Sequence, residues 1–499
     1  MQENAPLKRN AIGYASSVVI GVASTAPGYS LAAVLGLIVA VGGVGVHAPG
    51  VLIVSFVPML LVALGYKYLN KADPDAGTTF AWATKAFGPR TGWLGGWAII
   101  VADLIVMANL AQIAGLYSFL LFGIQAPSTL AVTAVGVVWI AIMTAVCVIG
   151  VEVNARTQRW LLAAEIVTLA AFAVVALVRV GLGDGAVTPS LDWFSPFAVG
   201  SVGALTSGLL VAIFIYWGWD SLVCVNEETE DSETVPGKAA VMSVLILVGI
   251  YVIVATAAIA FGGVERLAGD SSGDVLGLLA GDVFGSALLG KVMIVAVLTS
   301  AAASTQTTIL PTSRTALSMA RAKAAPAALA AVHPRYLTPH VATWIMGGLS
   351  VAWYVGLTLV STNILFDSIA ALGLMIAFYY GLTGFACAWY YRRALTHSLS
   401  GFLLAGVAPF VGGSILAFVF VRSCFDLGRA DAGSTTYFGI GSPLVIGVGF
   451  LLLGVVLMGI WRAAGHAEFF RRRPSAAAPD ALGSDAPRVR THEDLPAVV

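Results

Sequence analysis

Three carboxylic acids lie within stretches of sequence that are otherwise apolar, and they are the side chains best placed to do chemistry. They are Asp103, Glu165 and Asp220. An ionised side chain at the centre of a membrane costs roughly 2.5 to 3.5 kcal/mol on insertion scales, so an acid at that depth is functional by default. A carboxyl group in such surroundings can load and release a proton near neutral pH. These residues therefore predict a site that handles protons or cations.

Two of the apolar stretches are broken by residues that open a helix. The first break runs from Ala23 through Pro27 to Gly28, and the second covers residues 216–220, Tyr-Trp-Gly-Trp-Asp. Because lipid offers no hydrogen-bond partners, backbone opened at membrane depth must line a protected cavity or be satisfied by neighbouring polar groups. Paired breaks in the two halves of a chain are typical of proteins that bind a solute near the bilayer midplane. An ordinary proline kink is the alternative for the first break, and the matching second break favours a site.

The first break has the composition of a carboxylate-binding segment. Opening the helix frees backbone N–H groups, and the start of the following half-helix carries a partial positive charge that suits an anion. Small side chains let a ligand approach the backbone closely, and two hydroxyl groups can add hydrogen bonds. The predicted contacts are Ala23, Ser24, Thr25, Ala26 and Gly28.

The second break offers the complementary chemistry. Freed carbonyl groups around Ile215 to Trp217 can accept hydrogen bonds from an amine, and the aromatic rings of Tyr216, Trp217 or Trp219 can cover a ligand. Packing or membrane-interface roles are the alternative for these aromatic residues. Together the two breaks suit a molecule that carries both a carboxylate and an amine.

The three acids have different expected roles. Glu165 is the predicted coupling group, and hydrogen-bonded packing is its alternative. It would carry a proton, or it would bind sodium with hydroxyl oxygens of a later helix, at Ser300, Ser304, Thr305 or Thr308. Asp220 is a second ion-coupling candidate, with satisfaction of the opened N–H groups as its structural alternative. Asp103 is expected to face the pathway, where two anions would favour a cationic substrate, although either acid could instead pair with a polar neighbour and hold helices together.

The elements that carry these residues are membrane-spanning helices. The chain has 499 residues, of which 59% are hydrophobic and only 10% charged, and its mean hydropathy is +0.91. A soluble fold does not carry so much apolar sequence. Counting stretches near the roughly 20 residues that cross a bilayer predicts about twelve spans, at residues 12–41, 45–66, 93–121, 128–150, 158–181, 200–225, 239–263, 286–312, 341–361, 365–391, 401–422 and 441–462.

The distribution of Lys and Arg predicts the orientation of these spans. Nearly all basic residues fall on one side of the topology, whereas the opposite loops carry mainly Arg266 and Arg429. Basic residues concentrate on the cytoplasmic side of membrane proteins, so both termini are expected there. The connections predict a short helix over 79–87 and a basic helical hairpin over 313–340 on that side, and a short helix within 264–285 on the other. The predicted domains are a cytosolic N-terminus at 1–10, a membrane domain at 11–463 and a mostly disordered cytosolic tail at 464–499.

Two segments resemble the amino acid-polyamine-organocation permeases. The sixth-helix signature of that family is matched at Tyr216, Gly218, Trp219, Asp220, Asn226, Glu227, Glu228, Thr229, Asp231, Pro236 and Gly237, and its connection between helices eight and nine at Ser313, Arg314, Ala320, Arg321, Pro326, His333, Pro334, Arg335, Pro339, His340, Val341 and Ala342. With the number of spans, the resemblance covers residues 10–465. It implies a leucine-transporter-like all-α polytopic membrane fold. Helices one to five (12–181) and six to ten (200–391) would form a five-plus-five inverted repeat with broken helices one and six, and 401–462 would hold two peripheral helices.

The sequence also departs from this family. The family places a Gly, small residue, Gly triplet before the first break, and neither Val22 nor Ala23 supplies the second glycine. Glu165 stands where several proton-coupled members carry a lysine that replaces a sodium site. These departures weaken the transfer of carboxylate contacts and leave the coupling ion open between protons and sodium.

These features predict a secondary active transporter and not an enzyme. We expect import of an amino acid or related amine across the plasma membrane by alternating access, with protons as the favoured coupling ion. A polyamine or cationic amino acid transporter, an exchanger and a sodium-coupled transporter are alternatives, and a transport-inactive membrane sensor is the contrasting class. The expected partners are a small-molecule substrate and membrane lipid, without nucleic acid, cofactor or metal; the oligomeric state is not predicted. The six histidines and four cysteines have spacings unsuited to metal binding.

Overall fold

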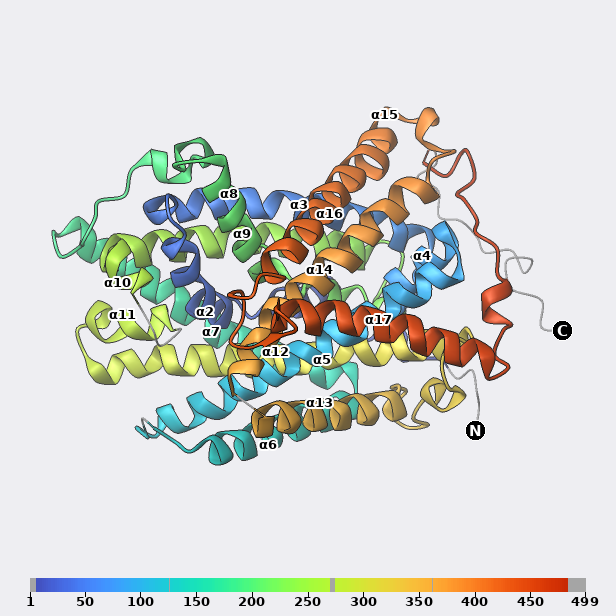
Figure 1. Ribbon diagram of the computed structural model, residues 1–499, viewed down its shortest axis with the longest axis horizontal. Coiled ribbons are helices and arrows are strands. Elements are labelled where there is room, and N and C mark those ends of the chain that lie inside the picture. Colours follow the sequence, from blue (N-terminus) through green and yellow to red (C-terminus); the bar gives the residue numbers. More distant parts are fainter. Residues whose placement is uncertain (1–5, 125, 270–273, 361, 483–499) are drawn as a thin grey trace.

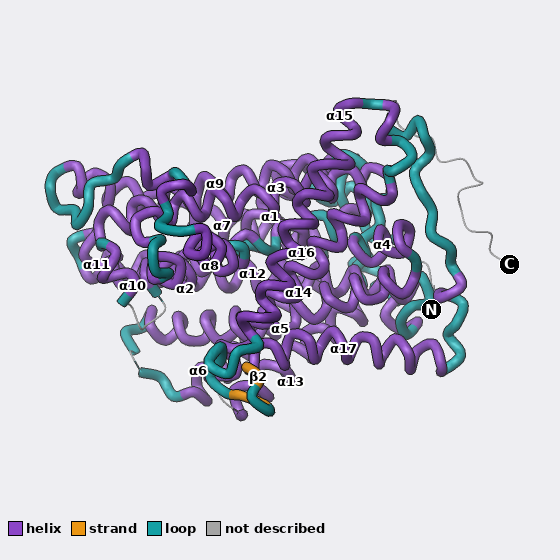
Figure 2. Tube along the Cα trace, turned by 45° about the horizontal axis from the view of Figure 1, so that its top comes forward, coloured by secondary structure: helices purple, strands orange, loops and turns teal. Residues whose placement is uncertain are grey.

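Helices make up nearly all of the regular structure. The computed structural model describes residues 6–124, 126–269, 274–360 and 362–482. Within these residues the strands are limited to one antiparallel pair, β1 (Thr436–Tyr437) and β2 (Ile440–Gly441). Figure 2 shows this pair at one edge of an otherwise helical molecule. The prediction of an all-α fold is confirmed.

Twelve segments in the described residues are long and apolar enough to cross a membrane. They are built from α1 (Tyr14–Ser24) with α2 (Pro27–Ala40), α3 (Ala48–Ala72), α5 (Pro89–Leu121), α6 (Thr129–Ile149), α7 (Val151–Gly181), α8 (Val202–Ala212) with the turns after it, α9 (Val235–Gly262), α12 (Ala287–Arg321), α13 (His340–Val360), α14 (Thr362–Tyr390), α15 (Leu399–Gly401) with the π-helical η9 (Phe402–Val407) and α16 (Ala408–Leu427), and α17 (Ser442–Ala463). The number of spans agrees with the sequence prediction. The first and sixth spans are the ones broken near the middle.

Several spans are longer than predicted, and two of them extend well beyond their predicted ends. Helix α3 continues past residue 66 to Ala72, and α12 continues past residue 312 to Arg321, so the basic hairpin predicted over 313–340 is wrong in its first part. Pro311 lies inside α12, where it removes a helical N–H donor. The helix nevertheless continues to Arg321, and Ser313 Oγ bonds to the carbonyl of Ile309 at 2.8 Å within it.

Several helices of the first half of the chain pack against helices of the second half. Helix α5 packs against α12, α3 against α9 and α6 against α13, and Figure 1 shows α6 and α13 side by side. These pairs hold equivalent places in the predicted five-plus-five arrangement. The repeat and the proposed domain limits stay predictions. Helix α17 lies on the outside, where few of its residues are buried.

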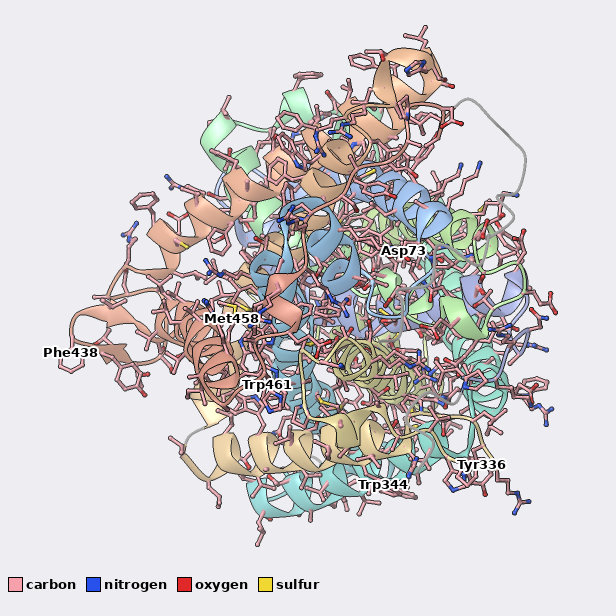
Figure 3. All side chains as sticks on the ribbon, turned by 90° about the vertical axis from the view of Figure 1, so that its right-hand side faces the viewer. Asp73, Tyr336, Trp344, Phe438, Met458 and Trp461 are labelled. Carbon is pink, nitrogen blue, oxygen red and sulfur yellow. The ribbon has the colours of Figure 1, made fainter. Side chains whose placement is uncertain are left out.

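One end of the bundle, called here the terminal end, carries the first described residues, α4 (Thr79–Phe87) and the segment that follows α17. Leu7 packs on Leu317 of α12, and Phe80 of α4 stacks on Phe469 at 5.6 Å between ring centroids. The predicted helix over 79–87 is confirmed at both ends. Figure 3 looks onto this end, with Asp73 near α4 and Trp461 near the end of α17.

The segment after α17 is more ordered than predicted. Residues 464–482 lie against the terminal end, where Ser475 N donates to the carbonyl of Lys85 at 2.7 Å and Ala477 N donates to the carbonyl of Tyr390 at 2.9 Å. The prediction of a mostly disordered tail is therefore wrong for these residues, because Phe469 and Ala477 are buried there. Residues 483–499 lie outside the described residues.

Short helices connect the spans. Within 264–285, where one short helix was predicted, the chain forms α10 (Val264–Ala268) and α11 (Val275–Phe284), and Asp270 lies outside the described residues. The remaining short turns are η1 (Gly45–His47), η2 (Leu191–Phe194), η3 (Pro196–Ala198), η7 (Ala327–Ala330), η8 (Leu395–His397) and η10 (Phe469–Arg471).

Candidate functional site

The first break is two residues long. Thr25 ends α1, and Ala26 takes a left-handed backbone conformation with φ 46° before α2 begins. Both residues keep their N–H groups bonded to the end of α1, at 3.2 Å to the carbonyl of Val22 and 3.1 Å to that of Ala23. These two donors are therefore not available to a ligand.

The first N–H groups of α2 are bonded to side chains from other helices. Gly28 N donates to Glu165 Oε1 of α7 at 2.6 Å, and Tyr29 N donates to Ser300 Oγ of α12 at 3.2 Å. The next donor, Ser30 N, is already bonded within the segment to the carbonyl of Ala26 at 2.8 Å. Because Pro27 has no N–H group, every donor from residue 25 to residue 30 has a partner. The prediction that this break presents free N–H groups to a substrate is wrong for this conformation.

Glu165 is the acid that binds the backbone N–H at the start of α2, where the sequence predicted that an anion would bind. Its Oε1 also accepts a hydrogen bond from Ser300 Oγ at 2.8 Å, and its side chain is fully buried. Its second oxygen, Oε2, is buried and has no hydrogen-bond partner among the described residues. A carboxylate at the start of a half-helix is stabilised by the backbone donors and the helix dipole. The structure thus links the predicted coupling group directly to the predicted carboxylate segment.

After the second break, the rest of the sixth span is not α-helical. After α8 the chain forms the turns η4 (Phe214–Tyr216), η5 (Trp219–Leu222) and η6 (Asn226–Glu228), with Gly218 at φ 113° between the first two. No α-helix forms in this span beyond Ala212. The expectation of a helix broken into two α-helical halves is therefore corrected, because the second half consists of 3₁₀ turns.

The aromatic residues of the second break point to different neighbours. The carbonyl of Ile215 accepts a hydrogen bond from Tyr251 of α9, and Tyr216 donates to the carbonyl of Leu52 at 3.0 Å. Both groups are thus used in packing here. Trp217 Nε1 donates to Tyr379 of α14.

Trp219 is fully buried and packs on other rings. Its ring lies 5.0 Å from Tyr66 and 5.2 Å from Tyr380, measured between centroids. Its Nε1 has no hydrogen-bond partner among the described residues, which is unusual because a buried indole N–H normally finds an acceptor. This donor is free to bond an additional acceptor at the break.

The other two acids lie near each other. Asp220 accepts hydrogen bonds from Tyr380 at 2.8 Å and Tyr379 at 3.1 Å, both on α14. Asp103 of α5 is buried within electrostatic range of Asp220, and its Oδ2 has no hydrogen-bond partner among the described residues. The sequence did not indicate that these two tyrosines belong near the acids, because their part of α14 contains neither a break nor an acid.

The two breaks meet at Ser24. Its Oγ lies 2.8 Å from Ser221 Oγ, and its carbonyl accepts a hydrogen bond from Ser304 of α12 at 3.0 Å. The structure therefore brings Ser24, Ser304, Gly28 and Glu165 close together, and their role in a site stays a prediction. Thr308 is buried farther along α12, and no contact joins its hydroxyl to Glu165 among the described residues.

Only glycine fits at residue 218, where the second break passes close to Ser24 of the first. A Cβ atom there would lie 2.7 Å from the carbonyl oxygen of Ser24, and the φ of 113° is one that L-residues rarely adopt. We expect Gly218→Ala to push the two breaks apart and to weaken substrate binding at least about tenfold, equivalent to about 1.4 kcal/mol. The measurement is ligand affinity in purified protein. Gly249→Ala is the matched control, since a Cβ there meets nothing within 4 Å, and equal affinities for the two variants would place the site elsewhere.

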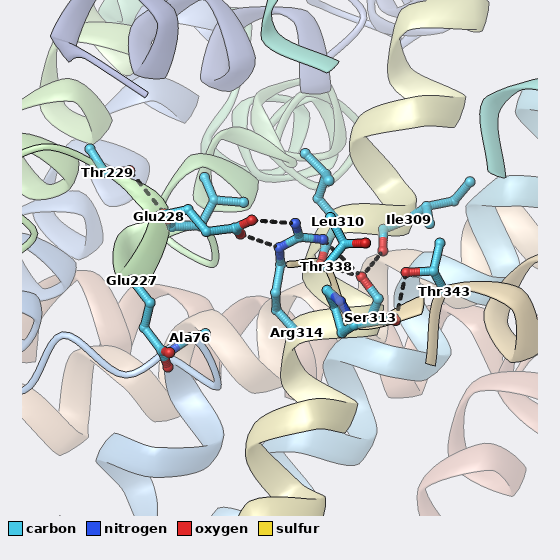
Figure 4. A network of polar contacts seen from close by, with 12 residues as sticks. Ala76, Glu227, Glu228, Thr229, Ile309, Leu310, Ser313, Arg314, Thr338 and Thr343 are labelled. Atoms are coloured by element: carbon cyan, nitrogen blue, oxygen red, sulfur yellow. Dashed lines mark hydrogen bonds and ion pairs between the residues drawn. The ribbon is translucent and has the colours of Figure 1, made fainter. Parts of the chain in front are cut away.

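Two ion pairs join the last turns of the sixth span to α12. Glu228 of η6 accepts two hydrogen bonds from Arg314 of α12, at 2.7 and 3.0 Å, and both side chains are fully buried. Figure 4 shows the guanidinium group facing this carboxylate, with Glu227 directed toward Ala76. Glu227 also pairs with Arg321 at 2.9 Å. A cavity of about 220 Å³ lies beside these residues, and its lining includes Asp73, Phe80, Lys85, Ser318 and Arg472.

A helical membrane protein in which two opened spans cross, with buried acids beside them, has the construction of a solute transporter. The sequence matches the family described as amino acid permease over residues 12–451. The chain therefore belongs to the amino acid permease family and is a transporter and not an enzyme.

Relatives within the curated proteins agree with this family. An uncharacterized transporter of Mycobacterium tuberculosis is 30% identical over 350 residues, covering 69% of this chain and 73% of the relative. Asc-type amino acid transporter 1 of Homo sapiens is 26% identical over 435 residues, 84% of this chain and 76% of the relative. The low-affinity putrescine importer of Escherichia coli is 26% identical over 202 residues, 40% of this chain and 43% of the relative.

Proposed function

We propose that this protein imports an amino acid or a related amine across the plasma membrane by alternating access, driven by protons. The observation that carries the proposal is Glu165, a fully buried acid bonded to the first N–H of the half-helix at the break. Names of relatives support the substrate class, since they include amino acid transporters and a putrescine importer.

The surroundings of Glu165 favour protons over sodium as the coupling ion. Its Oε1 is approached by the N–H of Gly28 and the hydroxyl of Ser300, which are both hydrogen-bond donors. Ser304 directs its hydroxyl hydrogen to the carbonyl of Ser24. A sodium ion requires several oxygen acceptors directed at one point, whereas a proton requires one basic oxygen, and Oε2 supplies it.

The proposed orientation places the terminal end in the cytoplasm. Many of the basic residues belong to segments at this end, including Lys85 of α4, Lys323 after α12 and residues 471–473 after α17. The concentration of basic residues on the cytoplasmic side of membrane proteins supports this orientation.

Uptake into proteoliposomes tests the proposal. With an inwardly directed proton gradient, we expect a radiolabelled amino acid or amine to accumulate inside, and a protonophore to abolish the accumulation. A sodium gradient alone is expected to drive none. Thermal-shift screening of amino acids, polyamines and small amines selects the probe, because a ligand that binds the folded state stabilises it. Ligand binding without uptake or exchange under any gradient would overturn transport and support a membrane sensor.

A further inference from the structure

We propose that Glu165 and the carboxylate of the substrate exchange places at the Gly28 N–H, with one proton bound to Glu165 for each amino acid bound. This inference rests on the proposed function and adds a specific mechanism to it. In this structure the protein's own carboxylate occupies the anion position, so Glu165 acts as a tethered substitute for the substrate's carboxylate.

The partners of the N–H groups decide where an incoming carboxylate can bind. Between Thr25 and Ser30, the donors bonded to backbone carbonyls are parts of turns that define the break. Only Gly28 and Tyr29 donate to side chains, and these side chains come from α7 and α12. A side chain can rotate away without unfolding the break, whereas a backbone partner cannot. The exchangeable donors are therefore those that Glu165 and Ser300 now hold.

The contact at Gly28 is close enough that two anions cannot share it. A Cβ atom on Gly28 would lie 3.2 Å from Glu165 Oε1, so the carboxylate rests directly against the backbone. A second carboxylate at the same N–H would place like charges side by side in a site without bulk water, where their repulsion is large. An ionised Glu165 therefore competes with an ionised substrate for this position.

A proton on Glu165 removes this competition. The buried Oε2 has no partner, and when protonated it becomes an O–H donor that can bond the arriving carboxylate. The neutral carboxyl group also accepts less strongly from Gly28, which releases that N–H to the substrate. The proton comes from the same compartment as the substrate, stays on Glu165 during binding and returns to solvent when the substrate leaves. No other bond is formed or broken.

The helices packed around Glu165 bring no second acid or base into contact with it among the described residues. Among the described residues, Tyr251 of α9 lies within electrostatic range, and a phenol is neutral near pH 7. Helices α1 and α6 contain no charged residue, and α2 and α12 contact Glu165 through Gly28 and Ser300. Asp282 of α11 is paired with Arg266.

Matched pairs of ligands with and without a carboxylate test the exchange. Calorimetry in buffers of different ionisation enthalpy compares lysine with cadaverine and leucine with isoamylamine. When the amino acid of a pair binds, we expect the protein to take up about one proton from solvent. The dissociation constant of the amino acid is expected to rise about tenfold per pH unit once Glu165 ionises. The decarboxylated amine is expected to bind without this uptake. In Glu165→Gln, binding of the amino acid is expected to lose both its proton uptake and its pH dependence.

Glu152→Gln is the control, because Glu152 lies on the same helix but is exposed and pairs with Lys8. It is expected to keep the full proton uptake. Amino acid binding with unchanged proton uptake in Glu165→Gln would overturn the exchange, and so would binding of the amines alone. Failure of the proposed function is separate: it would be seen as absent transport of every probe into proteoliposomes, whatever the calorimetry shows.

Discussion

Glu165→Gln is expected to abolish proton-driven accumulation of substrate, bringing the ratio of inside to outside concentration to about one, while binding persists. A one-to-one symporter can accumulate substrate about tenfold per pH unit of gradient, so the effect grows with the gradient imposed. The physical reason is that glutamine keeps the shape and the acceptor for the Gly28 N–H but cannot carry a proton. Uptake and counterflow in proteoliposomes measure the two properties separately. Exchange of labelled for unlabelled substrate is expected to continue.

The control for this prediction is again Glu152→Gln, which makes the same chemical change on an exposed part of α7. It should accumulate substrate as the unchanged protein does. Normal accumulation by Glu165→Gln under a proton gradient would show that Glu165 is not the coupling group. Asp103 would then be the next acid to test, since its Oδ2 is also buried without a hydrogen-bond partner.

Glu228→Gln is expected to destabilise the protein by about 3 to 5 kcal/mol, the range found when one partner of a buried ion pair is removed. Both side chains of the Glu228–Arg314 pair are fully buried, and the guanidinium group stays charged when its partner is neutralised. The loss is therefore the cost of an uncompensated charge as well as of one of the two hydrogen bonds, because the glutamine NH₂ group cannot accept from Arg314. Thermal unfolding of the purified protein measures the effect as a lower Tm.

A double variant separates charge from packing. Glu228→Gln with Arg314→Met removes both charges, and it is expected to regain a large part of the lost stability. Asp426→Asn is the control. Asp426 pairs with Arg422, one helical turn away, at an exposed position, and exposed pairs contribute little to stability. A Tm for Glu228→Gln equal to that of the control would mean that the buried pair does not hold the terminal end together.

The sequence predicted the fold well because each span carries its own signal. Apolar length located twelve helices, and the small helix at 79–87 follows from the turn residues on either side of it. Two errors have physical causes. Arg314 was assigned to a surface hairpin because basic residues usually lie in solvent, whereas its charge is neutralised by an acid 86 residues away. The segment after α17 has no periodic apolar pattern, yet single side chains such as Phe469 anchor it.

The candidate site was only partly predictable. The breaks and the acids were visible, because proline and charged residues are rare within spans, and Pro27 marks the first break and Asp220 the second. The pairing of Glu165 with Gly28 was not, since it joins residues separated by 137 positions and depends on how two helices face each other. The backbone donors and the acid were therefore predicted as separate parts of the site. The contact between them changes the role expected of each, because the acid now holds the donor that was assigned to the substrate.

The 3₁₀ turns after Gly218 have a mechanical consequence. A 3₁₀ backbone rises about 2.0 Å per residue and an α-helix about 1.5 Å. Hydrogen bonds such as Val223 N to the carbonyl of Asp220 and Glu228 N to that of Val225 join residues three apart. Rewinding these turns into α-helix would shorten the segment by roughly 0.5 Å per residue without exposing its backbone to lipid. The second half of the sixth span can thus change its length between Gly218, where the two breaks meet, and the ion pair at Glu228.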